Sequence, residues 1–197
     1  MAIRLLAGCL AAIAAKHNIG IDVVFSHRNE HYVRVYSTIK YGAKTADETI
    51  KNMGFVLHCY KCLHRESVKG QLIIGHSEEC SECGSKLGVA GPLWLGKLSD
   101  AKFCDMIKQE TGKRTLRLGS KIRKMLELIE AETNGPISYF VVDKICDALG
   151  SPVPSVKKVI EALRKTGFEA VPTHFSQGGM RTNAPASIVK KAVSESV

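Results

Sequence analysis

Four cysteines make the pattern in this sequence that is most specific for one kind of chemistry. Cys59 and Cys62 form one C-x-x-C pair, Cys80 and Cys83 form a second, and 17 residues separate the pairs. Tetrahedral zinc takes four thiolates, and each tight C-x-x-C turn delivers two sulfurs to one ion. The pattern predicts a structural zinc site in a zinc ribbon; a redox role or a chance arrangement is the alternative. Three nearby histidines are spare ligands: His58, His64 and His76. Of these, His64 is able to replace a cysteine.

The remaining cysteines argue against a disulfide framework. The chain has seven cysteines, an odd number, and Cys9, Cys104 and Cys146 stand alone in apolar surroundings with helical periodicity. Lone cysteines in such places are usually small core residues. A reducing compartment, the cytoplasm, is therefore expected.

Basic residues form the second chemical signal. The chain carries 28 Lys and Arg against 19 Asp and Glu. Residues 113–197 alone hold 14 basic and 8 acidic side chains, which suggests a polyanionic partner such as nucleic acid. A predicted helix over residues 156–165 has apolar residues at core spacing and basic residues elsewhere. Its candidate phosphate contacts are Lys157, Lys158, Arg164 and Lys165, with a merely solvated basic face as the alternative.

Aromatic residues offer a third, weaker signal. Tyr32, Arg34 and Tyr36 alternate along a predicted strand and so share one face. Aromatic rings beside arginine are able to stack and pair with RNA. Packing within a sheet explains the same pattern, and the sequence favours packing. Trp94 is likewise expected to anchor a core between domains rather than to stack on a base.

The first residues predict a buried helix over 3–17. Ile3, Leu6, Leu10 and Ile13 recur at helical spacing, and alanines widen the apolar surface, so other elements must cover it. A signal peptide is the alternative, but too few apolar residues precede Cys9 for that. The run is also shorter than the roughly 20 residues that span a bilayer, so no membrane association is expected.

The periodicity of the sequence predicts an α+β fold in which a winged helix follows a zinc ribbon. Three helices followed by a hairpin, after a polar break at residues 111–115, is the order of a winged helix. No internal repeat interrupts this order. The expected helices cover residues 3–17, 44–54, 100–110, 116–133, 139–149, 156–165 and 186–193. The expected strands cover 19–25 and 31–40, a hairpin lies within 64–79, a loop covers 90–100, and two extended pieces flank 178–179.

Four stretches together resemble one family. The sequences "MAIRLLAGCLAAIAAKHNIGI", "VFSHRNEHYVRVY", "GPLWLGKLSD" and "THFSQGGMRTNAP" are similar to the C-terminal half of the tRNA guanine-26 N2-dimethyltransferases of archaea and eukaryotes. The resemblance runs from residue 1 to about Ala186. In the last stretch the family usually has Lys and Asp where this chain has Arg181 and Asn183.

The resemblance implies a function and a domain plan. The family transfers methyl groups from S-adenosylmethionine to the exocyclic N2 of a guanine in tRNA. Residues 1–54 would be the end of a class I methyltransferase sheet, a helix with an antiparallel strand pair. Residues 55–112 would be the zinc ribbon with a connecting segment, and 113–197 a winged-helix-like tRNA-binding domain. His174 and Arg181 would contact RNA or pack domains together.

The resemblance also implies what this chain lacks. It contains no glycine-rich strand-to-helix loop, no acidic ribose partner after such a loop, and no Asp-Pro-aromatic motif. We therefore expect no catalytic or cofactor-binding residue here, Met1 to be an internal methionine, a missing N-terminal catalytic half as a partner, and no activity of the chain alone. The alternative is a stand-alone zinc-ribbon and winged-helix regulator that binds nucleic acid.

Overall fold

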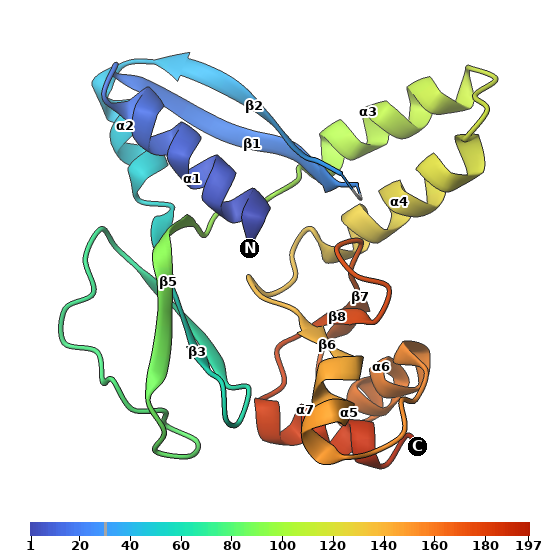
Figure 1. The fold of residues 1–197 in the computed structure, drawn as a ribbon. Helices are drawn as coiled ribbons and strands as arrows, with labels where there is room; N and C mark the ends of the chain where they lie inside the picture. The colour runs from blue at the N-terminus through green and yellow to red at the C-terminus, as the bar shows by residue number, and fades with distance from the viewer. Residues whose placement is uncertain (30) are drawn as a thin grey trace. The chain divides into compact units, whose positions relative to one another are not determined.

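The computed structural model describes residues 1–29 and 31–197, and it divides the chain into two compact units (Figure 1). The first unit covers Met1–Asp100 and the second Ala101–Val197. The expected boundary at 112/113 is thus displaced to 100/101. The expected division between residues 54 and 55 lies inside the first unit, which continues to Asp100.

The first unit begins as the sequence predicts. Helix α1 (Ala2–Ala15) precedes β1 (Ile19–Arg28) and β2 (Val33–Tyr41), which pair antiparallel, and α2 (Ala43–Ile50) follows. The predicted helix and strand pair are confirmed. A β-bulge between Val23 and Phe25 shifts the register within β1.

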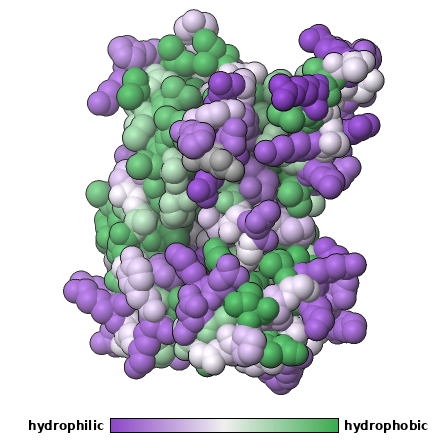
Figure 2. Space-filling model, turned by 45° about the vertical axis from the view of Figure 1, so that its right-hand side comes forward, coloured by the Kyte–Doolittle hydropathy of each residue, from purple (hydrophilic) through white to green (hydrophobic). Residues whose placement is uncertain are grey.

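Helix α1 buries a different face from the one its large residues suggest. Ile3, Ala7 and Ala11 are buried, whereas Leu6 is 43%, Leu10 39% and Ile13 59% exposed. The expectation that these larger side chains form the buried face is therefore wrong. The small residues let the helix approach closely: a Cβ on Gly8 would lie 3.1 Å from the Trp94 backbone nitrogen. Figure 2 shows hydrophobic side chains gathered at its upper left.

Trp94 is the aromatic anchor of the first unit. It is 3% exposed and packs in one cluster with Ala7, Ala11 and Met53. Its indole Nε1 donates to the Lys97 carbonyl at 2.9 Å, and its own carbonyl accepts from the buried Arg4 guanidinium at 2.9 Å. Residues 90–100 were expected to form a loop, but Trp94 ends a strand. Residues 87–94 pair with the strand that ends at the first cysteine, Cys59.

A three-stranded sheet carries the cysteine motif. It consists of β3 (Met53–Cys59), β4 (Arg65–Lys69) and β5 (Leu87–Trp94), in the antiparallel order β4-β3-β5. The hairpin expected within residues 64–79 is instead formed by β3 and β4, which the first C-x-x-C turn connects.

The second unit starts with a helical hairpin. Helices α3 (Ala101–Gly112) and α4 (Gly119–Glu132) pack together, and an ion pair joins Lys108 to Glu130. The polar segment 111–115 is thus a connection between two packed helices rather than a domain boundary. The remaining elements are β6 (Phe140–Val141), α5 (Val142–Leu149), α6 (Val156–Lys165), β7 (Ala170–Pro172), β8 (Gly179–Thr182) and α7 (Ala186–Ser194).

A small antiparallel sheet of order β6-β8-β7 accompanies these helices. Helix α6 buries Val159, Ile160 and Leu163 against it and its neighbours, and the Ser155 hydroxyl caps the helix by accepting from the Lys158 amide at 3.3 Å. No helix in the described ranges is both long and apolar enough for a membrane crossing.

The close packing of α1 yields a matched test of the fold. Ala11 is fully buried and Ala12 is exposed on the same helix. Ala11→Leu should destabilise the first unit by about 1–3 kcal/mol through overpacking, and Ala12→Leu should change stability by less than about 0.5 kcal/mol. Urea unfolding followed by Trp94 fluorescence measures both variants, since Trp94 lies in the same core. Equal midpoints would show that the small face of α1 is not packed as described.

Candidate metal centre and nucleic-acid interface

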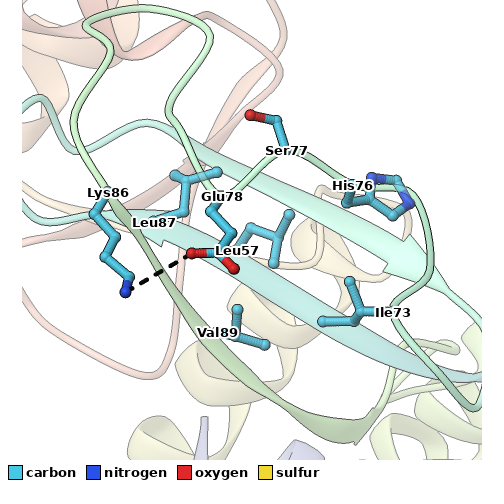
Figure 3. A pocket seen from close by; sticks show the side chains of 8 residues that line it. All are labelled: Leu57, Ile73, His76, Ser77, Glu78, Lys86, Leu87 and Val89. Atoms are coloured by element: carbon cyan, nitrogen blue, oxygen red, sulfur yellow. Dashed lines mark ion pairs between the residues drawn. The ribbon is translucent and has the colours of Figure 1, made fainter.

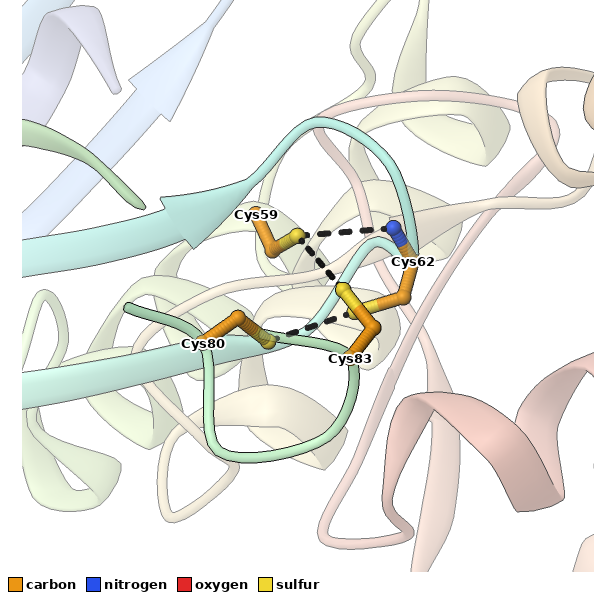
Figure 4. Close-up of side chains that lie close together, drawn as sticks. All are labelled: Cys59, Cys62, Cys80 and Cys83. Carbon is orange, nitrogen blue, oxygen red and sulfur yellow. Dashed lines mark hydrogen bonds between the residues drawn. The ribbon is translucent and has the colours of Figure 1, made fainter. Parts of the chain in front are cut away.

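The four cysteine sulfurs converge on one point. The Sγ atoms of Cys59 and Cys83 are 3.5 Å apart, those of Cys62 and Cys80 are 3.4 Å apart, and all four lie within 4.8 Å of one another (Figure 4). A tetrahedron with zinc–sulfur bonds of about 2.3 Å has sulfur–sulfur edges of about 3.8 Å. The cluster therefore has the dimensions of a four-thiolate zinc site.

The two cysteine turns share one backbone pattern. In the first, the Cys59 amide donates to the His64 carbonyl at 2.9 Å, and the Leu63 amide donates to the Cys59 carbonyl at 2.9 Å. The second repeats both bonds at the equivalent positions, from Cys80 to the Ser85 carbonyl and from Gly84 to the Cys80 carbonyl, each at 2.8 Å. Leu63 and Gly84 both adopt positive φ, 69° and 68°. Such paired turns orient two sulfurs each toward a common centre.

The environment of the sulfurs is uneven. Cys59 and Cys80 are buried, and Cys62 and Cys83 are half-buried. Hydrogen bonds from the side chain and backbone of Ser85 lower the pKa of Cys83 to about 6, whereas burial raises the pKa of Cys62 to about 12. A cation would stabilise the thiolate form of all four, because metal coordination deprotonates thiols.

The histidines near the motif lie outside the sulfur set. The His64 Nδ1 lies 3.1 Å from the Glu82 carboxylate, so this ring links the two turns instead of replacing a cysteine. His58 accepts from the Arg65 Nε at 3.3 Å and packs edge-on against Tyr60.

His76 lines an open hollow beside the β4-β3-β5 sheet. The volume of the hollow is about 380 Å³, and a long ion pair of 3.7 Å between Lys86 and Glu78 spans part of it (Figure 3). Both charged side chains are mostly exposed, so the hollow gathers no buried polar groups of the kind that bind a small molecule. It is lined by Leu57, Ile73, His76, Ser77, Glu78, Lys86, Leu87 and Val89.

The basic residues predicted on α6 are exposed. Lys157 is 88% exposed at its side chain, and its nearest carboxylate, that of Glu161, is 4.0 Å away. The Arg164 Nε donates to the Ala170 carbonyl at 2.9 Å, which fixes the stem of that side chain. The four residues thus give α6 a basic outer side: Lys157, Lys158, Arg164 and Lys165.

His174 and Arg181, also predicted to contact RNA, are corrected by the structure. Each side chain is only 4% exposed and pairs with the buried Glu132 carboxylate. The Arg181 guanidinium also donates to the carbonyls of Pro136 and Ile137, so it has no free face. Both residues hold the second unit together, because a buried charge requires a partner within the protein.

Glu132, which was not predicted from the sequence, is the buried partner of both side chains. Its carboxylate accepts from the Thr173 hydroxyl, from the His174 ring and amide, and from Arg181. Burial alone would raise its pKa, but the His174 hydrogen bond and the Arg181 charge hold the pKa of Glu132 below its ordinary value. One signal was available: an acidic residue at a helix C-terminus opposes the helix dipole and therefore needs compensation.

Comparison with known proteins places these features in a family. A family model described as N2,N2-dimethylguanosine tRNA methyltransferase matches residues 1–194. The chain belongs to this family. The family predicted from the four sequence stretches is therefore confirmed.

Relatives in the family have similar sequences over most of this chain. The tRNA (guanine(26)-N(2))-dimethyltransferase of Methanobrevibacter smithii is 41% identical over 97% of the chain and 49% of its own length. That of Methanosarcina mazei is 38% identical over 98% of the chain and 49% of its length. A solved structure of Trm1 from Pyrococcus horikoshii with S-adenosyl-L-methionine superposes with a TM-score of 0.82 at 30% identity, covering 96% of this chain and 48% of that one. The chain thus spans about half the length of the relatives it matches.

These matches correct the assignment to the C-terminal half of the family's enzymes. The family match covers residues 1–194 rather than ending near Ala186, and it includes residues 1–54 together with the rest of the chain. We therefore assign the chain to the family over its whole matched range. The expected C-terminal placement is wrong, and a missing N-terminal catalytic half is not supported as a partner.

The sulfur geometry makes a direct prediction about metal content. The purified chain should hold about one zinc per molecule, and Cys80→Ser should lower the zinc content and unfold the segment around the two turns. Cys9→Ser is the matched control, because Cys9 is an exposed cysteine outside the cluster. Elemental analysis after reduction measures both variants. A parent chain without stoichiometric zinc, or equal zinc loss in the two variants, would contradict the site.

Proposed function

We propose that this chain supplies the tRNA-binding scaffold of an S-adenosylmethionine-dependent tRNA guanine N2-methyltransferase. The main support is the family match over residues 1–194. The exposed basic side of α6 adds a physical reason, because cationic side chains on one helix face suit a phosphate backbone.

The chemistry of the reaction explains why binding matters. The exocyclic amine of guanine is a weak nucleophile, since its lone pair is delocalised into the ring. An enzyme accelerates its methylation largely by holding the amine in line with the methyl donor. The target base lies in folded tRNA and has to be extruded to reach a pocket, so a firm grip on the surrounding RNA is needed.

We infer that the second unit is winged-helix-like. Helices α4, α5 and α6 with the sheet order β6-β8-β7 follow that plan, and β7 and β8 stand where a wing would be. In such modules the third helix commonly contacts nucleic acid, and α6 is the third of the helices α4, α5 and α6. Its apolar side faces the core and its basic side faces outward, as this role requires.

We assign the cysteine cluster a structural zinc. Four thiolates fill a tetrahedral shell and leave no open position for a substrate. The ion would tie the end of β3 to the segment before β5. Zinc-bound thiolates and unpaired cysteines persist in a reducing compartment, so we also propose a cytoplasmic location.

The alternative of a stand-alone nucleic-acid-binding regulator explains less. It makes residues 1–40 an accessory element, whereas the family match includes them from the first residue. The packing of α1 against Trp94 also joins these residues to the sheet that carries the cysteines.

The binding role is tested through salt dependence. The chain should bind tRNA with a steep decrease of affinity as salt rises, because phosphate neutralisation releases counterions. Replacing the four basic residues of α6 by glutamine should reduce the slope of log affinity against log salt by roughly 3, since each lost phosphate contact removes about 0.7–0.9. The variant is Lys157→Gln, Lys158→Gln, Arg164→Gln and Lys165→Gln.

A control with the same charge change separates local contact from net charge. Lys113→Gln, Arg114→Gln, Lys190→Gln and Lys191→Gln remove four charges elsewhere in the second unit. Three of these side chains already pair with Glu110 or Glu195, so this variant should keep most of the parent's slope. Equal slopes in both variants would mean that α6 is not the contact surface.

We further propose that the 197-residue chain alone does not transfer methyl groups. The turn from β2 to α2 contains a single glycine, Gly42, instead of a glycine-rich phosphate-binding loop, and no Asp-Pro-aromatic motif occurs in the sequence. These residues do not fit S-adenosylmethionine, so no catalytic step is derived for them. Isothermal titration should show no binding of S-adenosylmethionine, and labelled cofactor should not methylate tRNA. Methyl transfer by the isolated chain would overturn this proposal.

A further inference from the structure

The β1–β2 ribbon carries a continuous series of aromatic rings on one face. The ring centroids of Phe25 and Tyr36 are 6.0 Å apart, those of His27 and Tyr36 are 6.4 Å apart and nearly parallel, and those of His27 and Tyr32 are 5.7 Å apart. The Arg34 guanidinium lies 4.7 Å from the centre of the Tyr32 ring. These contacts join five side chains in one array, in which the His27 and Tyr36 rings are stacked and the His27 and Tyr32 rings meet edge to face.

The β-bulge in β1 creates this array. Before it, Ile21 and Val23 face α1, as does Val35 of the partner strand. After it, Phe25 pairs with Tyr36 and His27 pairs with Arg34. Because a shift of one residue reverses the side to which a strand's side chains point, Phe25 and His27 join Tyr36 and Arg34 on the face away from α1. Bulges often re-aim side chains at functional sites.

The array is graded from buried to exposed. Phe25 is 5% exposed, whereas Tyr32 and Tyr36 are each 42% exposed. The inner ring thus fixes the outer rings in place, and the outer rings still present part of their surface to a ligand. Packing within the sheet accounts for Phe25, but it does not account for two half-exposed tyrosines beside an arginine.

The charge on this face suits nucleic acid. Asp22 is neutralised by an ion pair of 2.7 Å with Lys40, and Arg34 then adds positive charge beside the rings. Flat rings beside a guanidinium bind bases through stacking and tolerate any sequence, because every base has a π face. An apolar protein partner would bind better to a face without the Arg34 cation, so this face suits RNA better than such a partner.

We propose that Tyr32, Arg34 and Tyr36 form a stacking platform for an unpaired base of the RNA substrate. This inference rests on the proposed function, since it deepens the way in which the chain binds tRNA. It assigns the first unit a contact that differs in kind from the phosphate contacts of α6. Stacking depends on ring surface and on an unpaired base, whereas phosphate contacts depend on charge and salt.

The test replaces the exposed rings without changing charge. Tyr32→Leu with Tyr36→Leu should weaken tRNA binding about 5-fold or more, because stacking contributes roughly 1–3 kcal/mol per base. The slope of log affinity against log salt should stay that of the parent, since no cation is lost. Tyr32→Phe with Tyr36→Phe is the matched control and should keep the parent's affinity. Trp94 fluorescence and circular dichroism check that each variant is folded.

A second arm uses the form of the RNA as the readout. The leucine variant should lose affinity for a single-stranded RNA oligomer and keep the parent's affinity for a duplex of the same sequence, because paired bases hide their faces. Parent-like affinity of the leucine variant for both tRNA and the oligomer would overturn the platform, as would an equal loss on the duplex. If α6 variants still alter the salt slope in that case, the proposed tRNA binding stands without this inference. A parent chain that does not bind tRNA would overturn both.

Discussion

One buried carboxylate, that of Glu132, sets the geometry of the second unit. It lies at the end of α4 and accepts from Thr173, His174 and Arg181, which lie on β8 and on the segment between β7 and β8. Removing one member of such a buried pair typically costs about 3–5 kcal/mol, because the remaining charge is left without a partner. The network therefore fixes the small sheet against α4. The packing of Val159 and Leu163 then determines that the basic side of α6 faces outward.

The first unit depends on small residues and on paired sulfurs in a comparable way. Ala7, Gly8 and Ala11 let α1 approach the backbone at Trp94, and Arg4 donates to the carbonyls of Trp94 and Gly96. At the other end of β5 the cysteine turns close the sheet. A sheet of three short strands buries little apolar surface, so a metal that joins four thiolates would contribute much of its stability.

Local signals were enough to predict the elements but not their partners. The spacing of its apolar residues predicted α6 with the bounds observed. The cysteine spacing predicted the sulfur cluster, since two C-x-x-C turns have few other ways to fold.

The buried role of Arg181 was missed, because a charged residue in a polar segment is taken for a surface residue until its partner carboxylate, 49 positions earlier, is known. The buried face of α1 was predicted wrongly because the periodicity of large apolar residues was taken to mark it. The face that packs against β5 carries small residues instead, since the helix approaches the strand closely. The boundary at 112/113 failed because a polar turn between packed helices looks like a linker.

The aromatic ribbon shows how a one-residue irregularity changes the role of a whole face. A regular β1 would alternate without interruption, and Phe25 and His27 would then point toward α1, the side on which Ile21 and Val23 already lie. The bulge transfers two aromatic side chains to the other face, where Tyr32 and Tyr36 are half exposed. No composition or periodicity signal reveals such a bulge, because it depends on pairing with the neighbouring strand. The sequence pattern favours packing for these residues, but their exposed rings match the proposed contact with RNA. Under that proposal α6 would bind phosphates through charge, which salt screens, and the ribbon would stack on a base, which salt does not screen.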